Sequence, residues 1–230
     1  MKLRIIIILF CVCFSAKSQN NRTTFGLQYK PIIPAAYFNS SHINESSGGY
    51  DFNLIPKYSN SFGMVIRHKI NKTFSIESGL NYIQRNFKLT ATNNSINLDD
   101  FTTFNMRSYE LPIQLLAYIR VSKNWHLNVA FGISQNVLTS DVFSSGEESK
   151  NYFQNTYRKS GGYQALLTNI GMEYRTEEKG HYYFGASLHR PWKAIGKVFP
   201  EHDDFNQDKE FSLDLFGNFV TLDFRYFFAE

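Results

Sequence analysis

The densest group of residues able to bind a metal ion lies at 201–210. It consists of Glu201, His202, Asp203, Asp204, Asn206, Asp208 and Glu210. Three of these, Asp204, Asn206 and Asp208, match the first ligand positions of a calcium-binding loop. The match then ends, because Lys209 stands where the sharp turn needs glycine and Leu215 where a bidentate glutamate belongs. We interpret the segment as a hydrated acidic loop, and we expect no metal and no cofactor.

Ser187 and His189 are the nearest approach to a catalytic pair, since they lie two residues apart on one face of an expected strand. A serine hydrolase also needs an acid and oxyanion donors, which the sequence does not identify. An aspartate–histidine protease would have to draw on four loop residues, namely Asp99, Asp100, His202 and Asp203. Loop carboxylates are usually hydrated, so we expect no enzymatic activity. An enzyme that modifies lipid A stays open as an alternative.

Residues 1–18 have the composition of a secretory signal peptide. A positively charged start precedes an unbroken apolar stretch at 5–14, and small residues occupy the positions that signal peptidase inspects. The apolar stretch is too short to cross a bilayer as a helix, which needs ~20 residues. We therefore expect export and cleavage, which leaves 19–230 as a single domain.

The exported domain would contain no cysteine, because Cys11 and Cys13 both lie in the signal peptide. It therefore cannot use thiolate chemistry or a cysteine-ligated metal. Loss of Lys2, Arg4 and Lys17 lowers the formal charge from +4 to +1. Since the sequence also has no basic nucleic-acid patch and no glycine-rich phosphate loop, we expect no nucleic-acid partner.

Apolar and polar residues alternate in four segments, namely 74–82, 109–119, 125–133 and 220–228. Partial alternation occurs in four more, namely 24–32, 62–70, 164–174 and 182–189. A period of two predicts strands with one apolar face. Aromatic residues make up 17% of the chain, a content typical of strands and of membrane-interface girdles. A mean hydropathy of -0.33 fits strands that expose only alternate residues to lipid.

The connections between these eight segments alternate in length. Short links at 71–73, 121–124 and 176–181 are separated by long polar stretches at 38–61, 88–108, 140–163 and 190–218. Outer-membrane barrels have short periplasmic turns and long outer loops. The sequence therefore predicts an all-β fold, an eight-stranded antiparallel up-and-down transmembrane β-barrel with short periplasmic turns and long extracellular loops, in a Gram-negative outer membrane.

The two faces of the predicted strands differ in chemistry. The lipid-facing side is expected to carry Trp125, Leu127, Val129, Phe131, Leu222, Phe224 and Tyr226. The inner side is expected to carry Arg67, Glu77, Glu110, Glu173, Asp223 and Arg225. An eight-stranded barrel is only wide enough inside for side chains, and isolated buried charges are costly. We therefore predict an interior network of paired charges. Ile83, Leu116 and Leu167 break the alternation toward the inside.

The whole pattern resembles the PorT-like outer-membrane β-barrel family. The similar stretches are 25–34, 78–82, 109–112 and 223–228. The resemblance implies a membrane barrel whose aromatic-ended last strand is the signal recognised by the barrel assembly machinery. Some members of that family assist a dedicated protein secretion and gliding system.

We therefore expect a non-enzymatic scaffold or accessory protein in contact with outer-membrane lipid, whose outer loops contact a partner protein or a glycan. The loop aromatics assigned to such contacts are Tyr37, Phe101, Phe104, Tyr152, Phe153, Trp192 and Phe199. Composition equally allows these residues to belong to the aromatic girdle and to loop packing. A narrow pore or hydrophobic-solute conduit is a second alternative, and a soluble periplasmic barrel with its apolar face inward is a third.

Overall fold

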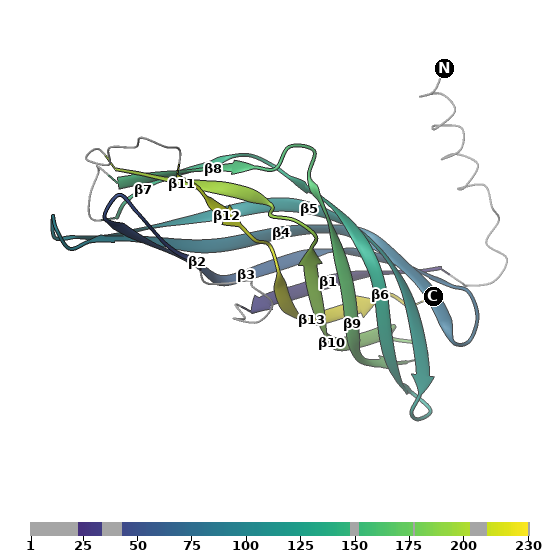
Figure 1. The fold of residues 1–230 in the computed structure, drawn as a ribbon. Coiled ribbons are helices and arrows are strands. Elements are labelled where there is room, and N and C mark those ends of the chain that lie inside the picture. The colour runs from purple at the N-terminus through teal and green to yellow at the C-terminus, as the bar shows by residue number, and fades with distance from the viewer. Residues whose placement is uncertain (1–22, 34–42, 148–151, 177, 203–210, 230) are drawn as a thin grey trace, which may run out of the picture.

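The computed structural model describes residues 23–33, 43–147, 152–176, 178–202 and 211–229 (Figure 1). The predicted signal peptide and most of the acidic segment at 201–210 lie outside these ranges. The described chain contains the strands β1 (Thr23–Ile33), β2 (Ile43–Ser47), β3 (Tyr50–Lys69), β4 (Phe74–Asn93), β5 (Leu98–Arg120), β6 (Trp125–Leu138), β7 (Val142–Ser145), β8 (Tyr152–Arg158), β9 (Tyr163–Arg175), β10 (His181–Pro191), β11 (Gly196–His202), β12 (Leu213–Leu215) and β13 (Phe219–Phe227). Over the same ranges, no helix has the length and apolarity to cross a membrane.

Eight of the strands close into a ring. Their order is β1-β13-β10-β9-β6-β5-β4-β3, and β3 pairs back to β1, while β2 continues the sheet beyond β3. Every pairing in the ring is antiparallel. A closed ring leaves no edge with unpaired backbone groups, which is what a β-structure in hydrocarbon requires. The predicted all-β antiparallel barrel is confirmed.

The ring has two different ends (Figure 1). Three short turns join β3 to β4, β5 to β6, and β9 to β10, and β13 finishes at the same end, where Phe228 N donates to Phe25 O at 2.9 Å. In the first turn the Asn71 side chain accepts hydrogen bonds from the backbone N–H groups of Thr73 and Phe74, both at 2.8 Å. This is the local bond by which asparagine stabilises a tight turn.

The prediction of long outer loops is wrong for most of their described residues. Residues 88–93 and 98–108 extend β4 and β5, and the later segments provide β7, β8, β11 and β12. These four short strands form a second sheet in the order β12-β11-β8-β7. It lies at the end opposite the short turns, together with the long ends of β3, β4 and β5 (Figure 1).

The two sheets enclose an apolar core at that end. We call this part the head: β2, β7, β8, β11, β12 and residues 50–57, 84–93 and 98–108; the rest of the ring is the barrel. Leu89 and Met106 from one sheet and Leu213 from the other are fully buried in the head core. Phe87 and Phe104 stack there with ring centroids 5.4 Å apart. The apolar side chains of this core point inward, whereas most apolar side chains of the barrel strands are exposed on the outside.

Tyr152 also lies in the head core and is fully buried. Burial raises the pKa of its hydroxyl, and the Asp100 carboxylate adds to the effect. The phenol is therefore neutral at physiological pH. Tyr152 and Phe104, which the sequence assigned to outer-loop contacts, instead form core, because their strands place them on the inner face.

Candidate functional site

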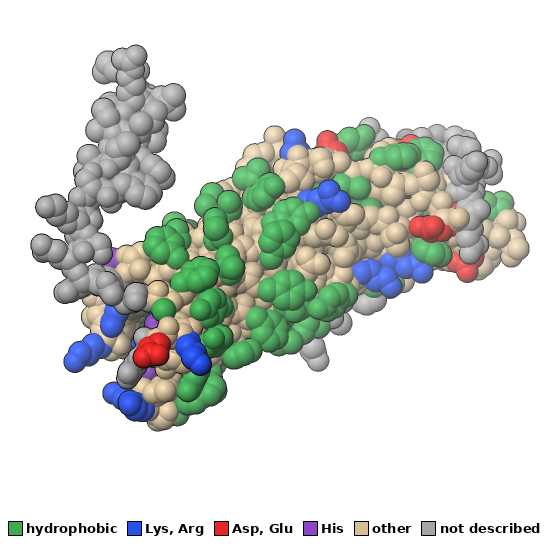
Figure 2. All heavy atoms as spheres, turned by 180° about the vertical axis from the view of Figure 1, so that it is seen from behind, with side chains coloured by type: hydrophobic (Ala, Val, Ile, Leu, Met, Phe, Trp, Pro, Cys, Tyr) green, Lys and Arg blue, Asp and Glu red, His purple; other side chains and the backbone are tan. Residues whose placement is uncertain are grey.

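The outer wall of the barrel is an apolar belt. Among the proposed lipid-facing residues, the exposed ones are Trp125, Val129, Phe131, Leu222 and Phe224, while Leu127 and Tyr226 are half-buried. Phe131 is 60% exposed. Figure 2 shows the hydrophobic side chains gathered over the barrel half of the molecule and sparser over the head. An exposed apolar surface of this extent is stable in contact with lipid acyl chains and not in water.

Aromatic pairs border the belt at both ends. At the short-turn end the pairs are Trp125–Tyr174 and Tyr182–Tyr226, with ring centroids 5.0 and 5.2 Å apart. At the head end they are Phe62–Tyr82 and Tyr82–Tyr109, at 5.1 and 5.8 Å. Aromatic girdles at the two membrane interfaces border the apolar band of a transmembrane barrel in this way.

Inside the barrel, charged side chains form a continuous network. Arg67 donates to Glu77 at 2.9 Å and also contacts Glu173. Arg225 bridges Glu77 and Asp223, with 2.8 Å to the latter. Each of these side chains is at most 6% exposed. Opposite charges therefore compensate one another where water has little access, which offsets the cost of burying them.

Further polar and charged groups pair with the outermost carboxylates of this lumen network, Glu173 and Asp223. Arg175 donates to Glu173 at 2.6 Å, and Lys30 lies 3.6 Å from Asp223. Asp223 also accepts from three polar side chains, namely Asn169, Ser187 and Thr221. The alternating chain of bases and acids thus runs across β9, β3, β4, β13 and β1.

Glu110 lies outside this chain of ion pairs. It accepts from Asn81 at 2.8 Å, and its carboxylate is 3.0 Å from His189 Nδ1. His189 stacks on Phe219 with ring centroids 4.3 Å apart. Ser187 donates to Asp223 at 2.6 Å. The serine and the histidine that the sequence singled out therefore face the lumen and contact different carboxylates.

Apolar and aromatic groups fill much of the remaining lumen. Arg67 lies over the Phe227 ring at 3.8 Å, and Arg225 over the Tyr183 ring at 4.7 Å. The three residues that break the alternation are buried: Ile83, Leu116 and Leu167. Sequence reasoning missed Tyr183, because Tyr182, Tyr183 and Phe184 follow one another and hide the period of two.

A second feature is the outer surface of the small sheet in the head. We call it the outer aromatic face: Phe143, Phe153, Tyr157 and Phe199. Its rings pair as Phe143–Phe153 at 5.8 Å and Tyr157–Phe199 at 5.4 Å between centroids. Phe143 and Tyr157 are 61% and 53% exposed. The sequence had indicated Phe153 and Phe199 but missed the other two.

The other predicted loop aromatics are dispersed. Lys88 Nζ lies 3.8 Å from the centre of the Phe101 ring, and Trp192 is 58% exposed. Tyr37 lies outside the described residues. Of the acidic segment, Glu201 is described and accepts from Asn155 at 3.1 Å. Within the described ranges no group of three or more His, Cys, Asp or Glu side chains could hold a metal ion.

Comparison with known proteins identifies the fold family. Residues 18–198 match the family described as outer membrane protein beta-barrel domain. The chain belongs to this family. Its barrel therefore lies in the outer membrane. The short turns of outer-membrane barrels are periplasmic, so we expect the head on the extracellular side.

A similar solved structure supports this outer-membrane barrel fold. The chain is similar to the outer membrane protein OprG from Pseudomonas aeruginosa, with 10% identity, a TM-score of 0.54, and coverage of 91% of this chain and 97% of that one. The outer membrane protease OmpT from Escherichia coli matches with 10% identity and a TM-score of 0.38, over 92% and 95% of the two chains. No curated protein matches the sequence.

Proposed function

We propose that this chain is a non-enzymatic surface scaffold that holds the outer aromatic face toward a partner protein outside the cell. The observation that carries the proposal is the head itself, a two-sheet unit with its own apolar core whose outer aromatic face has two exposed rings, Phe143 and Tyr157, and two part-buried ones, Phe153 and Phe199. Burial of the core fixes the sheet, so its rings are displayed on a rigid surface.

The chemistry of the outer aromatic face supports a protein contact. Aromatic residues are enriched at the centres of protein interfaces, and a few of them carry much of the binding energy. Between the rings, Asn155 donates to Glu201 at 3.1 Å, which supplies polar groups on the same face. A face that combines aromatic rings with a polar pair between them suits contact with a protein surface.

The filled lumen supports an anchoring role for the barrel. The network crosses the lumen, since Arg67 on β3 contacts Glu173 on β9, four strands away around the ring. An open path for solute would require these ion pairs to separate in a poorly hydrated interior, which is costly. The PorT-like resemblance of the sequence adds a context, since it implies partners in protein secretion or gliding.

The test of the partner contact is genetic. A strain lacking the gene is complemented with the wild type, with the double variant Phe143→Ser/Tyr157→Ser, or with the control Thr103→Ala, an exposed head residue outside the face. Surface and secreted proteins are then quantified by mass spectrometry. We expect the wild type and the control to restore the proteins lost on deletion, and the double variant to restore less than a tenth, because interface hot spots contribute about 2 kcal/mol or more each.

Equal restoration by the double variant would reject the aromatic face as the contact. All variants must show wild-type heat-modifiable gel mobility, which separates a lost contact from a barrel that has not folded.

The pore alternative is tested on the purified wild-type protein in planar bilayers. We expect no stepwise conductance, because the lumen network occupies the width that eight strands enclose. Steady single-channel currents, abolished by heat denaturation of the sample, would replace the scaffold proposal with a conduit.

A further inference from the structure

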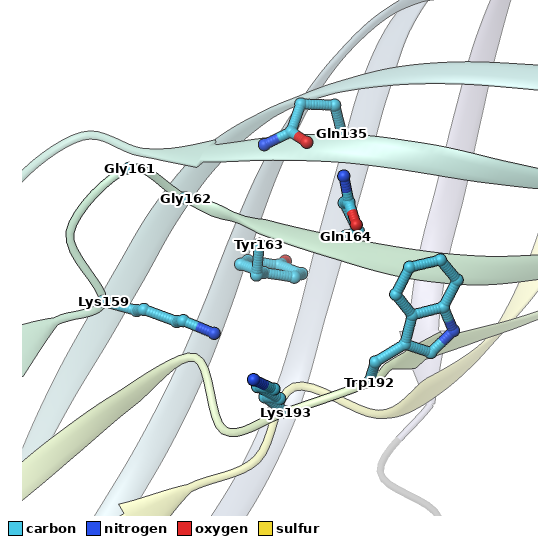
Figure 3. Close-up of a pocket in the computed structure, with 8 residues that line it drawn as sticks. All are labelled: Gln135, Lys159, Gly161, Gly162, Tyr163, Gln164, Trp192 and Lys193. Carbon is cyan, nitrogen blue, oxygen red and sulfur yellow. The ribbon is translucent and has the colours of Figure 1, made fainter.

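A pocket of about 250 Å³ opens on the outside of the molecule where the barrel meets the head. Two connections line it, the turn between β8 and β9 and the segment that follows β10. Its lining residues are Gln135, Lys159, Gly161, Gly162, Tyr163, Gln164, Trp192 and Lys193. Figure 3 shows the side chains of Lys159 and Lys193 pointing toward each other across the pocket, with Trp192 at one side.

The two lysines have no acidic partner in the described part of the chain. The nearby carboxylate of Asp141 instead lies 3.8 Å from Arg158. Two ammonium groups that converge on one pocket repel each other unless an anion lies between them. The charge of the pocket therefore favours an anionic ligand.

The backbone holds both lysines in place before any ligand binds. Lys159 N donates to Ile195 O at 2.8 Å, and Trp192 N donates to Gln164 O at 3.3 Å. Gly161 and Gly162 adopt φ values of 76° and 77°, which other residues rarely reach. A Cβ on Gly162 would lie 2.0 Å from Asn136 O. The turn that carries Lys159 is thus fitted against the barrel.

The height of the pocket matches the outer membrane interface. Gln135 and Gln164 pair in register on β6 and β9, and they are the next pair on the outer face after Ile133 and Leu166 of the apolar belt. Gln135 lies about ten residues from Trp125 at the periplasmic end, the length that a spanning strand needs. Trp192 is 58% exposed, as expected for an aromatic residue at a membrane interface.

We propose that this pocket binds a phosphate group of an outer-leaflet glycolipid, the phosphorylated diglucosamine head of lipid A. Lys159 and Lys193 contact the phosphate as point charges, and the Gln135 and Gln164 amides hydrogen-bond the sugar. The acyl chains lie along the apolar belt below. The pocket is separate from the outer aromatic face, so the lipid-binding proposal can be tested independently of the proposed contact with a partner protein.

The test uses the full protein in detergent, titrated with bisphosphorylated lipid A, with lipid A lacking both phosphates, and with inorganic phosphate, each followed by native mass spectrometry. We expect bisphosphorylated lipid A to bind at least tenfold more tightly than the dephosphorylated form. The double variant Lys159→Gln/Lys193→Gln should lose about tenfold or more in that affinity, since it removes two charge-assisted contacts. Lys159→Arg/Lys193→Arg should keep the affinity.

The matched control is Lys123→Gln, which removes an exposed lysine from a periplasmic turn and should leave lipid A binding unchanged. Equal affinity for the two lipid A forms, or full affinity in the glutamine double variant, would overturn the proposal. Inorganic phosphate that binds as tightly as the lipid would show that the ligand is free phosphate. Heat-modifiable mobility of each variant establishes that its barrel is folded.

Discussion

Replacing Glu77 with alanine is expected to destabilise the barrel by about 3–5 kcal/mol, the usual cost of breaking a buried ion pair by removing one partner. The carboxylate contacts both Arg67 and Arg225, and it is 4% exposed. Its loss leaves two buried guanidinium groups sharing the remaining acids, Glu173 and Asp223. Urea titration of the folded fraction in lipid vesicles, followed by heat-modifiable gel mobility, measures the change in unfolding free energy.

The control is Glu178→Ala, which removes an exposed carboxylate from the short turn between β9 and β10 and should change stability by less than about 0.5 kcal/mol. Adding Arg225→Ala to Glu77→Ala should cost less than the sum of the single changes, because the two residues share one network. A Glu77→Ala protein as stable as the control variant would mean that water screens the lumen charges.

Replacing Leu89 with alanine is expected to destabilise the head by about 2–5 kcal/mol, the range for truncating a fully buried leucine. Leu89 packs in the core between the two sheets, away from the lumen network. The measurement is limited proteolysis of intact cells under increasing urea, with cleavage in the head detected by mass spectrometry.

The neighbouring outward residue supplies the control, since Thr90→Ala leaves the head core intact. We expect the Leu89→Ala barrel to keep its heat-modifiable mobility at urea concentrations where the head is cleaved. Simultaneous loss of mobility and of protease resistance would show that head and barrel unfold as one cooperative unit.

The barrel strands could be predicted from sequence because lipid imposes a simple rule on them. Segments such as 109–119 and 125–133 alternate apolar and polar residues, and the structure has them as parts of β5 and β6. The head was missed although the same period is present there. Phe87, Leu89 and Ala91 alternate with half-buried Lys88 and Thr90. The segment is rich in polar residues, so it resembles an outer loop more than a lipid-facing strand.

The candidate sites differ in how far the sequence could reveal them. A charged residue on an otherwise apolar strand such as 220–228 has to face the lumen, so the sequence could assign Asp223 and Arg225 to the inner side. Their ion-pair partners depend on how the strands pair around the ring, which the sequence does not show. Lys159 and Lys193 come from separate connections, and no local pattern joins them. Tyr152 lies in a largely polar stretch of sequence. In such a stretch, the sequence does not distinguish a buried aromatic side chain from an exposed one.

The pairing of β4 with β5 runs without a register shift from Phe74–Ala117 at the short-turn end to Asn93–Leu98 at the tip of the head. Strands of this length reach roughly 65 Å at about 3.3 Å per residue, so the same two strands cross the bilayer and the head in one register. Because β4 and β5 are joined at the tip, a pull there would tension both strands together, and their hydrogen bonds to the neighbouring strands β3 and β6 would be loaded in shear. Tension applied to the tip by a bound partner would therefore be carried along β4 and β5 into the part of the sheet that forms the membrane wall.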